Sequence, residues 1–238
     1  GLTAASLVLW AFGGRIVVLT NPFGDEFHLG IFSLPLTVIW LVGVSNAINL
    51  MDGLDGLAGG VAFMASMTLM FIALLQGEPV IAILMAALSG SILGFLKYNL
   101  PPASIFMGDA GALTLGFLLA STAVITRYKT TVAMALLIPL AALLIPIADT
   151  LFTILRRWKA GKPLFQADRG HLHHRLLDKG LTPKQIITIV YGIGLILGLI
   201  SISFIFIPKQ YAFMILCGLA LVFLVVLYRL ESSSSHRK

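Results

Sequence analysis

The 238-residue chain is 58% hydrophobic and 11% charged, and its mean hydropathy is +1.00. Soluble domains carry about 25% charged residues, so this composition excludes an ordinary soluble protein. The net charge of +6 is compatible with a nucleic-acid partner, but an excess of Lys and Arg in the cytoplasmic loops of a membrane protein explains it better. We therefore expect a lipid bilayer, and no nucleic acid, as a partner of this chain.

Long apolar segments recur along the chain. A helix needs about 20 apolar residues to cross a bilayer core, and a helix satisfies all its backbone groups within one segment, as hydrocarbon requires. The candidate spans are Leu2–Thr20, Ile31–Leu50, Leu57–Leu75, Val80–Leu96, Ala112–Thr126, Val132–Leu155, Ile186–Ile207 and Tyr211–Tyr228. We predict an all-α, polytopic transmembrane helical bundle of about eight spans, forming a single integral membrane domain over residues 1–238.

Positive charges predict the orientation of these spans. Alternation across the membrane places 12 of the 16 Lys and Arg residues on one side: Lys97, Arg156, Arg157, Lys159, Lys162, Arg169, Arg175, Lys179, Lys184, Arg229, Arg237 and Lys238. Cytoplasmic loops are rich in Lys and Arg, so this side is predicted to be cytoplasmic. It includes a loop over residues 156–185, in which Thr182 and Pro183 mark a helix start, and a tail over residues 231–238 that we expect to be disordered.

The opposite side carries only short links. The segment "NPFGDEFHLG", residues 21–30, is expected to form a small hairpin on the outer surface, and His28 within it is read as structural. Arg15 falls inside the first predicted span, where it is interpreted as a structural contact between helices.

Carboxylates and carboxamides follow the second predicted span in "NAINLMDGLDGLAGG", residues 46–60. Asp52 and Asp55 are three residues apart, so on a helix they would be neighbours on one face, and Asn46 and Asn49 continue the same step toward the membrane. Hard oxygen ligands beside a glycine-rich backbone suit Mg²⁺ and phosphate. The alternative is a polar helix end with small residues that allow close helix packing.

Two further aspartates accompany this pair. Asp109 lies in "NLPPASIFMGDAG", directly before the fifth predicted span. An Asp at a helix start is often an N-cap, but the acids on the same predicted face favour a metal ligand. Asp149 lies inside the sixth predicted span, where it either faces a polar cavity or pairs with an Arg.

Three histidines occur within four residues in "DRGHLHHRL". His171, His173 and His174 are flanked by Arg169 and Arg175, and imidazole and guanidinium groups together favour a phosphate-binding surface. A transition-metal site and a solvated basic loop are the alternatives.

The three motifs, in this order and separated by apolar spans, resemble those of the polyprenyl-phosphate N-acetylhexosamine-1-phosphate transferases. The resemblance covers nearly the whole chain. It implies a bacterial, multi-pass inner-membrane enzyme whose active site is cytoplasmic and which moves a sugar 1-phosphate from a UDP-sugar to undecaprenyl phosphate, releasing UMP. The His-x-His-His form is similar to the branch that uses UDP-GlcNAc, to initiate a cell-envelope polysaccharide such as teichoic acid or lipopolysaccharide.

The resemblance also implies roles for single residues. Asp109 would bind Mg²⁺, with Mn²⁺ as an alternative ion. Catalytic residues would be Asp52, Asp55, His173 and His174. Residues that bind the substrate would be Asn49, Asn99, Phe106, Arg169 and His171, with the Phe106 ring stacking on uracil.

One feature of the family is missing from this sequence. The family carries an early cytoplasmic Asp-Asp pair, and no two aspartates are adjacent here. We therefore expect the first spans of the family fold to be absent and this chain to be inactive alone. Alternative functions are the UDP-MurNAc-pentapeptide transferase of peptidoglycan synthesis and, from another class, a cation-coupled membrane transporter. A homodimer is a further expected assembly.

Overall fold

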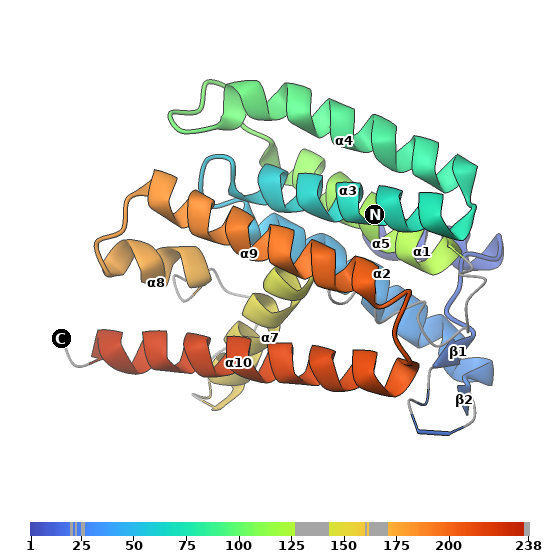
Figure 1. The fold of residues 1–238 in the computed structure, drawn as a ribbon. Coiled ribbons are helices and arrows are strands. Elements are labelled where there is room, and N and C mark those ends of the chain that lie inside the picture. The colour runs from blue at the N-terminus through green and yellow to red at the C-terminus, as the bar shows by residue number, and fades with distance from the viewer. Residues whose placement is uncertain are drawn as a thin grey trace.

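The computed structural model describes residues 1–19, 21, 23–24, 27–126, 143–159, 161 and 171–235, without the side chains of residues 159 and 230–235. Its helices are α1 Leu2–Ala11, α2 Ser33–Met51, α3 Leu57–Gln76, α4 Pro79–Asn99, α5 Gly108–Ile125, α7 Leu144–Lys159, α8 Leu172–Asp178, α9 Pro183–Ser203 and α10 Lys209–Ser235. A 3-10 turn, Gly30–Phe32, leads into α2, and the strands are β1 Val18–Leu19 and β2 Phe27–His28. The predicted all-α membrane bundle is confirmed (Figure 1).

Six of the described helices are long and apolar enough to cross a bilayer, namely α2, α3, α4, α5, α9 and α10. The first predicted span, Leu2–Thr20, is wrong as a single helix, because α1 ends at Ala11 and Gly13 adopts a left-handed φ of 93°. Ten helical residues extend only about 15 Å, half of a bilayer core. Much of the predicted span Val132–Leu155 lies outside the described residues, and its described part belongs to α7, which is not among the six.

Small side chains allow the long helices to approach closely. α3 lies between α4 and α9 (Figure 1) and packs against both. Ser66 on α3 and Ser89 on α4 share a buried hydrogen bond of 2.8 Å. Where α5 crosses α2, a Cβ added to Gly116 would lie 2.6 Å from Ser45 Cα. Small residues and hydroxyl pairs at crossings are typical of helices packed in membranes.

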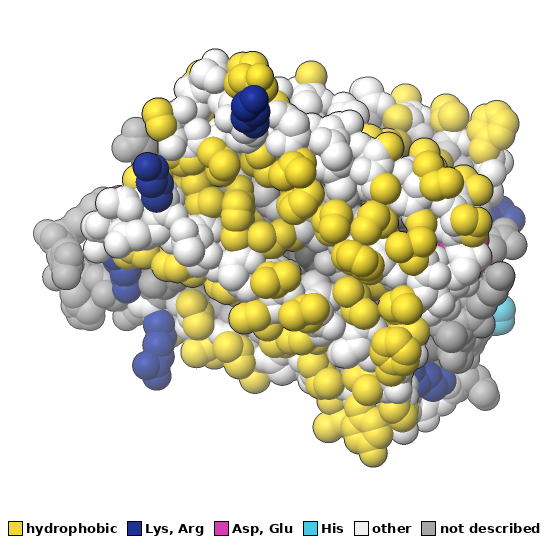
Figure 2. Space-filling model, turned by 45° about the horizontal axis from the view of Figure 1, so that its top comes forward, with side chains coloured by type: hydrophobic (Ala, Val, Ile, Leu, Met, Phe, Trp, Pro, Cys, Tyr) yellow, Lys and Arg dark blue, Asp and Glu magenta, His cyan; other side chains and the backbone are white. Residues whose placement is uncertain are grey.

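The outer surface of the bundle is apolar. Hydrophobic side chains cover much of the face in Figure 2, and the Lys and Arg side chains visible there lie near its margins. Residues such as Val80 and Ile83 on α4 or Leu221 and Val222 on α10 are more than half exposed. Such a surface has no favourable solvent except lipid, which makes this a multi-pass membrane protein.

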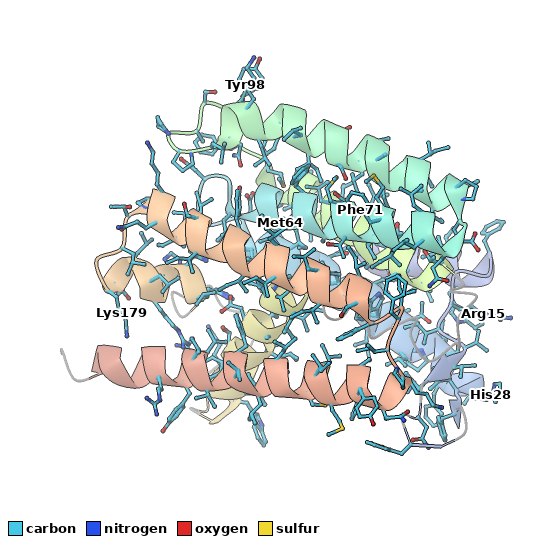
Figure 3. All side chains as sticks on the ribbon, viewed as in Figure 1. Arg15, His28, Met64, Phe71, Tyr98 and Lys179 are labelled. Carbon is cyan, nitrogen blue, oxygen red and sulfur yellow. The ribbon has the colours of Figure 1, made fainter. Side chains whose placement is uncertain are left out.

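The bundle has two different ends. At one end, which we call the α8 end, lie the turn between α2 and α3, the loop 100–107, helix α8 and the start of α9 (Figure 1). Figure 3 shows Lys179 there, and Arg15 and His28 at the opposite end. Arg15 is therefore not within a span; it lies exposed after α1, 5.6 Å from the ring of Trp10.

Three local predictions can be compared with these elements. A hairpin is present, with Val18 paired to His28 and Leu19 to Phe27 in antiparallel strands, but its first strand precedes the predicted segment 21–30. The predicted helix start is confirmed, because Thr182 forms a capping box with Gln185 and Pro183 occupies the first turn of α9. The predicted loop 156–185 contains helix α8, and α10 continues to Ser235, into the tail expected to be disordered.

Candidate functional site

A five-residue turn between α2 and α3, Asp52–Gly56, carries two of the predicted acids. Asp52 follows the last residue of α2, and its N–H bonds the carbonyl of Asn49 at 3.1 Å. Asp55 reaches toward a different segment, since its Oδ2 accepts a hydrogen bond of 3.0 Å from the Ala103 N–H. The turn is thus attached to the loop 100–107, and we call Asp52–Gly56 the acidic turn.

Asn99 makes a second connection between the same two segments. Its Oδ1 accepts a hydrogen bond of 2.9 Å from the Gly56 N–H. Its Nδ2 donates to the Ile105 carbonyl at 2.9 Å. Only 3% of the residue is exposed. The structure therefore gives Asn99 a positioning role, and its predicted contact with uridine stays a prediction.

Asp109 lies on the far side of that loop, in the first turn of α5. Met107 holds the N-cap position and makes no side-chain capping bond, so Asp109 is not the cap. Its side chain is exposed, where the positive end of the helix dipole favours a negative charge. Partial burial, then the charge of Asp109, then that of Asp55 raise the pKa of Asp52 from 3.8 to about 6. The charges of Asp55 and Asp109, which come from two different segments, therefore both act on Asp52.

The predicted histidines lie at the start of α8, held there by Asp149 of α7. Asp149 Oδ2 lies 2.9 Å from His171 Nδ1, and its Oδ1 accepts a hydrogen bond of 2.8 Å from the Leu172 N–H. Both carboxylate oxygens are used, and both residues are buried. Asp149 thus satisfies an otherwise unpaired N–H of the first helical turn. From the sequence, Asp149 was expected either to face a polar cavity or to pair with an Arg. In the structure its partner is His171.

His173 connects α8 to the acidic turn. A Cβ added to Gly53 would lie 2.6 Å from His173 Nε2, so the imidazole lies directly against the backbone of Gly53. The ring is parallel to that of His171, with centroids 6.2 Å apart, and 4.2 Å from that of His174. His173 Nε2 and the Oδ1 of Asn49 are buried atoms with no hydrogen-bond partner among the described residues.

Burial also changes the ionisation of this histidine. The pKa of His173 falls from 6.5 to about 4, mainly through burial and then through the positive charge of His174, with Asp149 opposing the shift and His171 adding to it. Its imidazole is therefore neutral at pH 7. A neutral imidazole has one donor and one acceptor nitrogen, which suits it to hydrogen bonding and less to ion pairing.

We expect this shift to make the fold sensitive to acid. Between pH 6.5 and about 4 the unfolded chain binds a proton at residue 173 that the folded chain does not bind, so the free energy of unfolding falls as the pH falls. Over the whole range, the free energy of unfolding should fall by roughly 3 kcal/mol. Thermal unfolding of the wild type and His173→Gln across this range measures it, and the variant should lose less stability.

His28→Gln is the matched control for that experiment, because His28 is exposed at the opposite end of the bundle. It should keep the wild-type pH dependence. Asp52 has a raised pKa and acts in the opposite direction below pH 6, but it is present in all three proteins and cancels in the comparison. Equal pH dependence in wild type and His173→Gln would contradict the burial of a neutral imidazole.

Other predicted residues have different surroundings. Arg175 donates from Nη1 to the Leu227 carbonyl at 2.9 Å and lies 4.7 Å from the centroid of the Phe152 ring, so it attaches α8 to α10 and α7. The structure therefore gives Arg175 a structural role, and its predicted place in a phosphate-binding surface stays a prediction. Phe106, in the loop 100–107, is 73% exposed, and Arg169 lies outside the described residues.

Two features of the site were not predicted from the sequence. Tyr191 of α9 donates a hydrogen bond of 2.6 Å to the Gly56 carbonyl, and its only signal was a polar group within an apolar run. The contact between Gly53 and His173 joins motifs 120 positions apart, which no local pattern indicates. Within the part of the chain that the structure describes, no three His, Cys, Asp or Glu side chains form a metal-binding group by themselves.

Comparison with known proteins identifies relatives of this chain. The model of the family described as glycosyl transferase family 4 matches residues 1–127. The chain is 39% identical over 198 residues to a Bacillus subtilis protein named "probable undecaprenyl-phosphate N-acetylglucosaminyl 1-phosphate transferase", covering 83% of this chain and 55% of the relative. It is 36% identical over 212 residues to a decaprenyl-phosphate N-acetylglucosaminephosphotransferase of Mycobacterium leprae, covering 80% and 53%.

A relative with a different sugar in its name also matches. The chain is 34% identical over 206 residues to a phospho-N-acetylmuramoyl-pentapeptide-transferase of Leptospira biflexa, covering 79% of this chain and 54% of the relative. The chain thus spans about half the length of the curated relatives it matches. The family resemblance predicted from the three motifs is confirmed by the family model and by these relatives. The chain belongs to glycosyl transferase family 4.

Proposed function

We propose that the protein transfers GlcNAc-1-phosphate from UDP-GlcNAc to undecaprenyl phosphate, releasing UMP, with Mg²⁺, at the cytoplasmic face of the bacterial inner membrane. The observation that carries the proposal is the contact of His173 with Gly53, which brings the histidines at the start of α8 against the acidic turn, where Asp55 and Asp109 both act on Asp52. The names of the Bacillus subtilis and Mycobacterium leprae relatives support the reaction class. The lipid-linked product would initiate a cell-envelope polysaccharide such as teichoic acid or lipopolysaccharide.

The reaction brings two anions together. An oxygen of the lipid phosphate forms a bond to the β-phosphorus of the UDP-sugar, and the bond between that phosphorus and the UMP oxygen breaks. A bound Mg²⁺ would reduce the repulsion between the two phosphates and stabilise charge on the leaving group. Lys97, Lys179 and Lys184 at the α8 end add positive charge around the site.

The residues present fit such an ion. Mg²⁺ in phosphoryl-transfer sites usually has one or two carboxylate ligands and completes its shell with water and substrate phosphates, so a cage of three protein ligands is not expected. Asp109 is exposed, and its charge opposes the ionisation of Asp52, a repulsion that a divalent cation relieves. Asp109 would be the main ligand, and Asp52 and Asp55 would line the same site.

The remaining side chains have roles that follow from their positions. The neutral His173 and its neighbour His174 would hydrogen-bond phosphate or sugar oxygens, because His173 Nε2 has no described partner. His171 is oriented by Asp149. The exposed ring of Phe106 would stack on uracil, which has an apolar face.

One observation favours a second candidate for the sugar donor. The Leptospira biflexa relative is named for the phospho-N-acetylmuramoyl-pentapeptide transfer. The higher identity to the Bacillus subtilis relative and the His-x-His-His form of residues 171–174 favour UDP-GlcNAc. UDP-MurNAc-pentapeptide is therefore the alternative donor.

The test uses membranes that contain the full-length protein and undecaprenyl phosphate. We expect Mg²⁺-dependent release of UMP from UDP-GlcNAc, with loss of the signal on chelation by EDTA and recovery on adding Mg²⁺ or Mn²⁺. Release from UDP-MurNAc-pentapeptide instead would reassign the donor. No UMP from either donor, in membranes where the folded protein is detected, would refute the proposed function.

A further inference from the structure

Both the N–H and the carbonyl of Gly56 are hydrogen-bonded to side chains of other helices. Its N–H donates to Asn99 Oδ1 at 2.9 Å, and its carbonyl accepts from the Tyr191 hydroxyl at 2.6 Å as well as from the Gly60 N–H at 2.9 Å. Its φ of 76° is left-handed, which glycine adopts without steric cost. The last residue of the acidic turn is therefore attached to α4 and to α9 at once.

The position of the Tyr191 ring is fixed by a second glycine. A Cβ added to Gly60 would lie 2.0 Å from two ring carbons and the hydroxyl oxygen of Tyr191, so the tyrosine side chain occupies the space where any other residue would place its own. Ile187, one turn earlier on α9, also lies beside Gly56. The hydroxyl is consequently directed at the Gly56 carbonyl by packing of the side chain against Gly60 of α3.

Helix α9, which carries Tyr191, directly follows the histidine-bearing helix α8 in the chain. α8 ends at Asp178, and α9 begins at Pro183 behind the capping box of Thr182. Any displacement of α9 therefore acts on both halves of the site, on α8 through the short connection and on the acidic turn through Tyr191. The carboxylate of Asp55, which precedes Gly56 directly, depends on the orientation of that peptide.

We infer that Tyr191 is a positioning residue, which holds the acidic turn in register with α8 for the transfer reaction. The inference rests on the proposed function and adds a residue that the three motifs do not contain. A single neutral hydrogen bond contributes about 1 kcal/mol to stability, whereas a displacement of about 1 Å in a catalytic group costs up to about 100-fold in rate. Loss of the hydroxyl should therefore reduce the rate far more than the stability.

Tyr191→Phe tests this, because it removes the hydroxyl and keeps the ring against Gly60. We expect kcat for UMP release to fall about tenfold with a smaller change in KM for UDP-GlcNAc and an almost unchanged unfolding temperature. Tyr228→Phe is the matched control, since Tyr228 is 66% exposed on α10. It should leave both kinetic constants unchanged.

A second readout does not depend on activity. Hydrogen exchange of the amides of residues 52–57 should become about fivefold faster in Tyr191→Phe and stay unchanged in Tyr228→Phe. Unchanged exchange, or a wild-type kcat in Tyr191→Phe when the wild type is active, would overturn the inference. So would a loss of rate fully explained by a lower unfolding temperature. An inactive wild type refutes the proposed function instead, and the exchange measurement still decides whether Tyr191 holds the turn.

Discussion

Replacing Asp109 by Asn is expected to lower UMP release by about a thousandfold. The change keeps the size and shape of the side chain but removes the charge that would bind Mg²⁺ beside the donor phosphates. Loss of one strong electrostatic interaction in a transition state typically costs 10²–10³-fold, and loss of metal binding adds to it. Because Asp109 is exposed in the first turn of α5, the fold should tolerate the change.

The measurement is the initial rate of UMP release in membranes with equal amounts of each protein. Asp178→Asn is the matched control, because Asp178 is also exposed and also lies at the α8 end, at the last position of α8. It should keep the wild-type rate. An undiminished rate in Asp109→Asn would remove Asp109 from the metal site and leave the carboxylates of the acidic turn as its described candidates.

Replacing Gly53 by Ala is expected to have the second largest effect. The new methyl group would lie 2.6 Å from His173 Nε2, which is well below van der Waals contact. His173 is 3% exposed and lies against His171 and His174, so its ring has little room to move away. Overpacking of this kind costs about 1–3 kcal/mol, and the histidine or the acidic turn must shift.

Such a shift should lower kcat for UMP release about 100-fold, because catalytic groups misplaced by about 1 Å lose rate on that scale. Gly43→Ala on α2 is the control, since nothing lies within 4 Å of a Cβ added there. It should be as active as the wild type and equally or slightly more stable. If Gly53→Ala and Gly43→Ala are equally active, His173 does not lie where the structure places it.

Much of the fold could be predicted because one physical rule governs it. A buried backbone in lipid must be helical, so apolar runs such as Leu57–Leu75 correspond closely to helices such as α3, Leu57–Gln76. The rule does not predict where a helix ends inside a long apolar segment. Leu2–Thr20 is apolar, yet Gly13 ends α1 after ten helical residues and the chain continues into a strand.

The site was less predictable because its contacts join segments that are distant in sequence. Acids and histidines on one predicted face indicated that the motifs share an end of the bundle, and the structure places them together there. Residue type did not reveal the partner of each group. Arg175 resembles a phosphate ligand in sequence but bonds the Leu227 carbonyl, and Asp149 pairs with His171 rather than with an Arg.

The contact between the acidic turn and α8 is tested most directly by chemical cross-linking. In a Cys217→Ser background, which removes the single native thiol, Gly53→Cys and His173→Cys should be joined by a short bifunctional thiol reagent. The pair Gly53→Cys and Tyr211→Cys, with Tyr211 at the opposite end of α10 from the site, should not be joined. Absence of product from the first pair, when each thiol alone reacts with a monofunctional reagent, would show that the carboxylates and the histidines do not share one site.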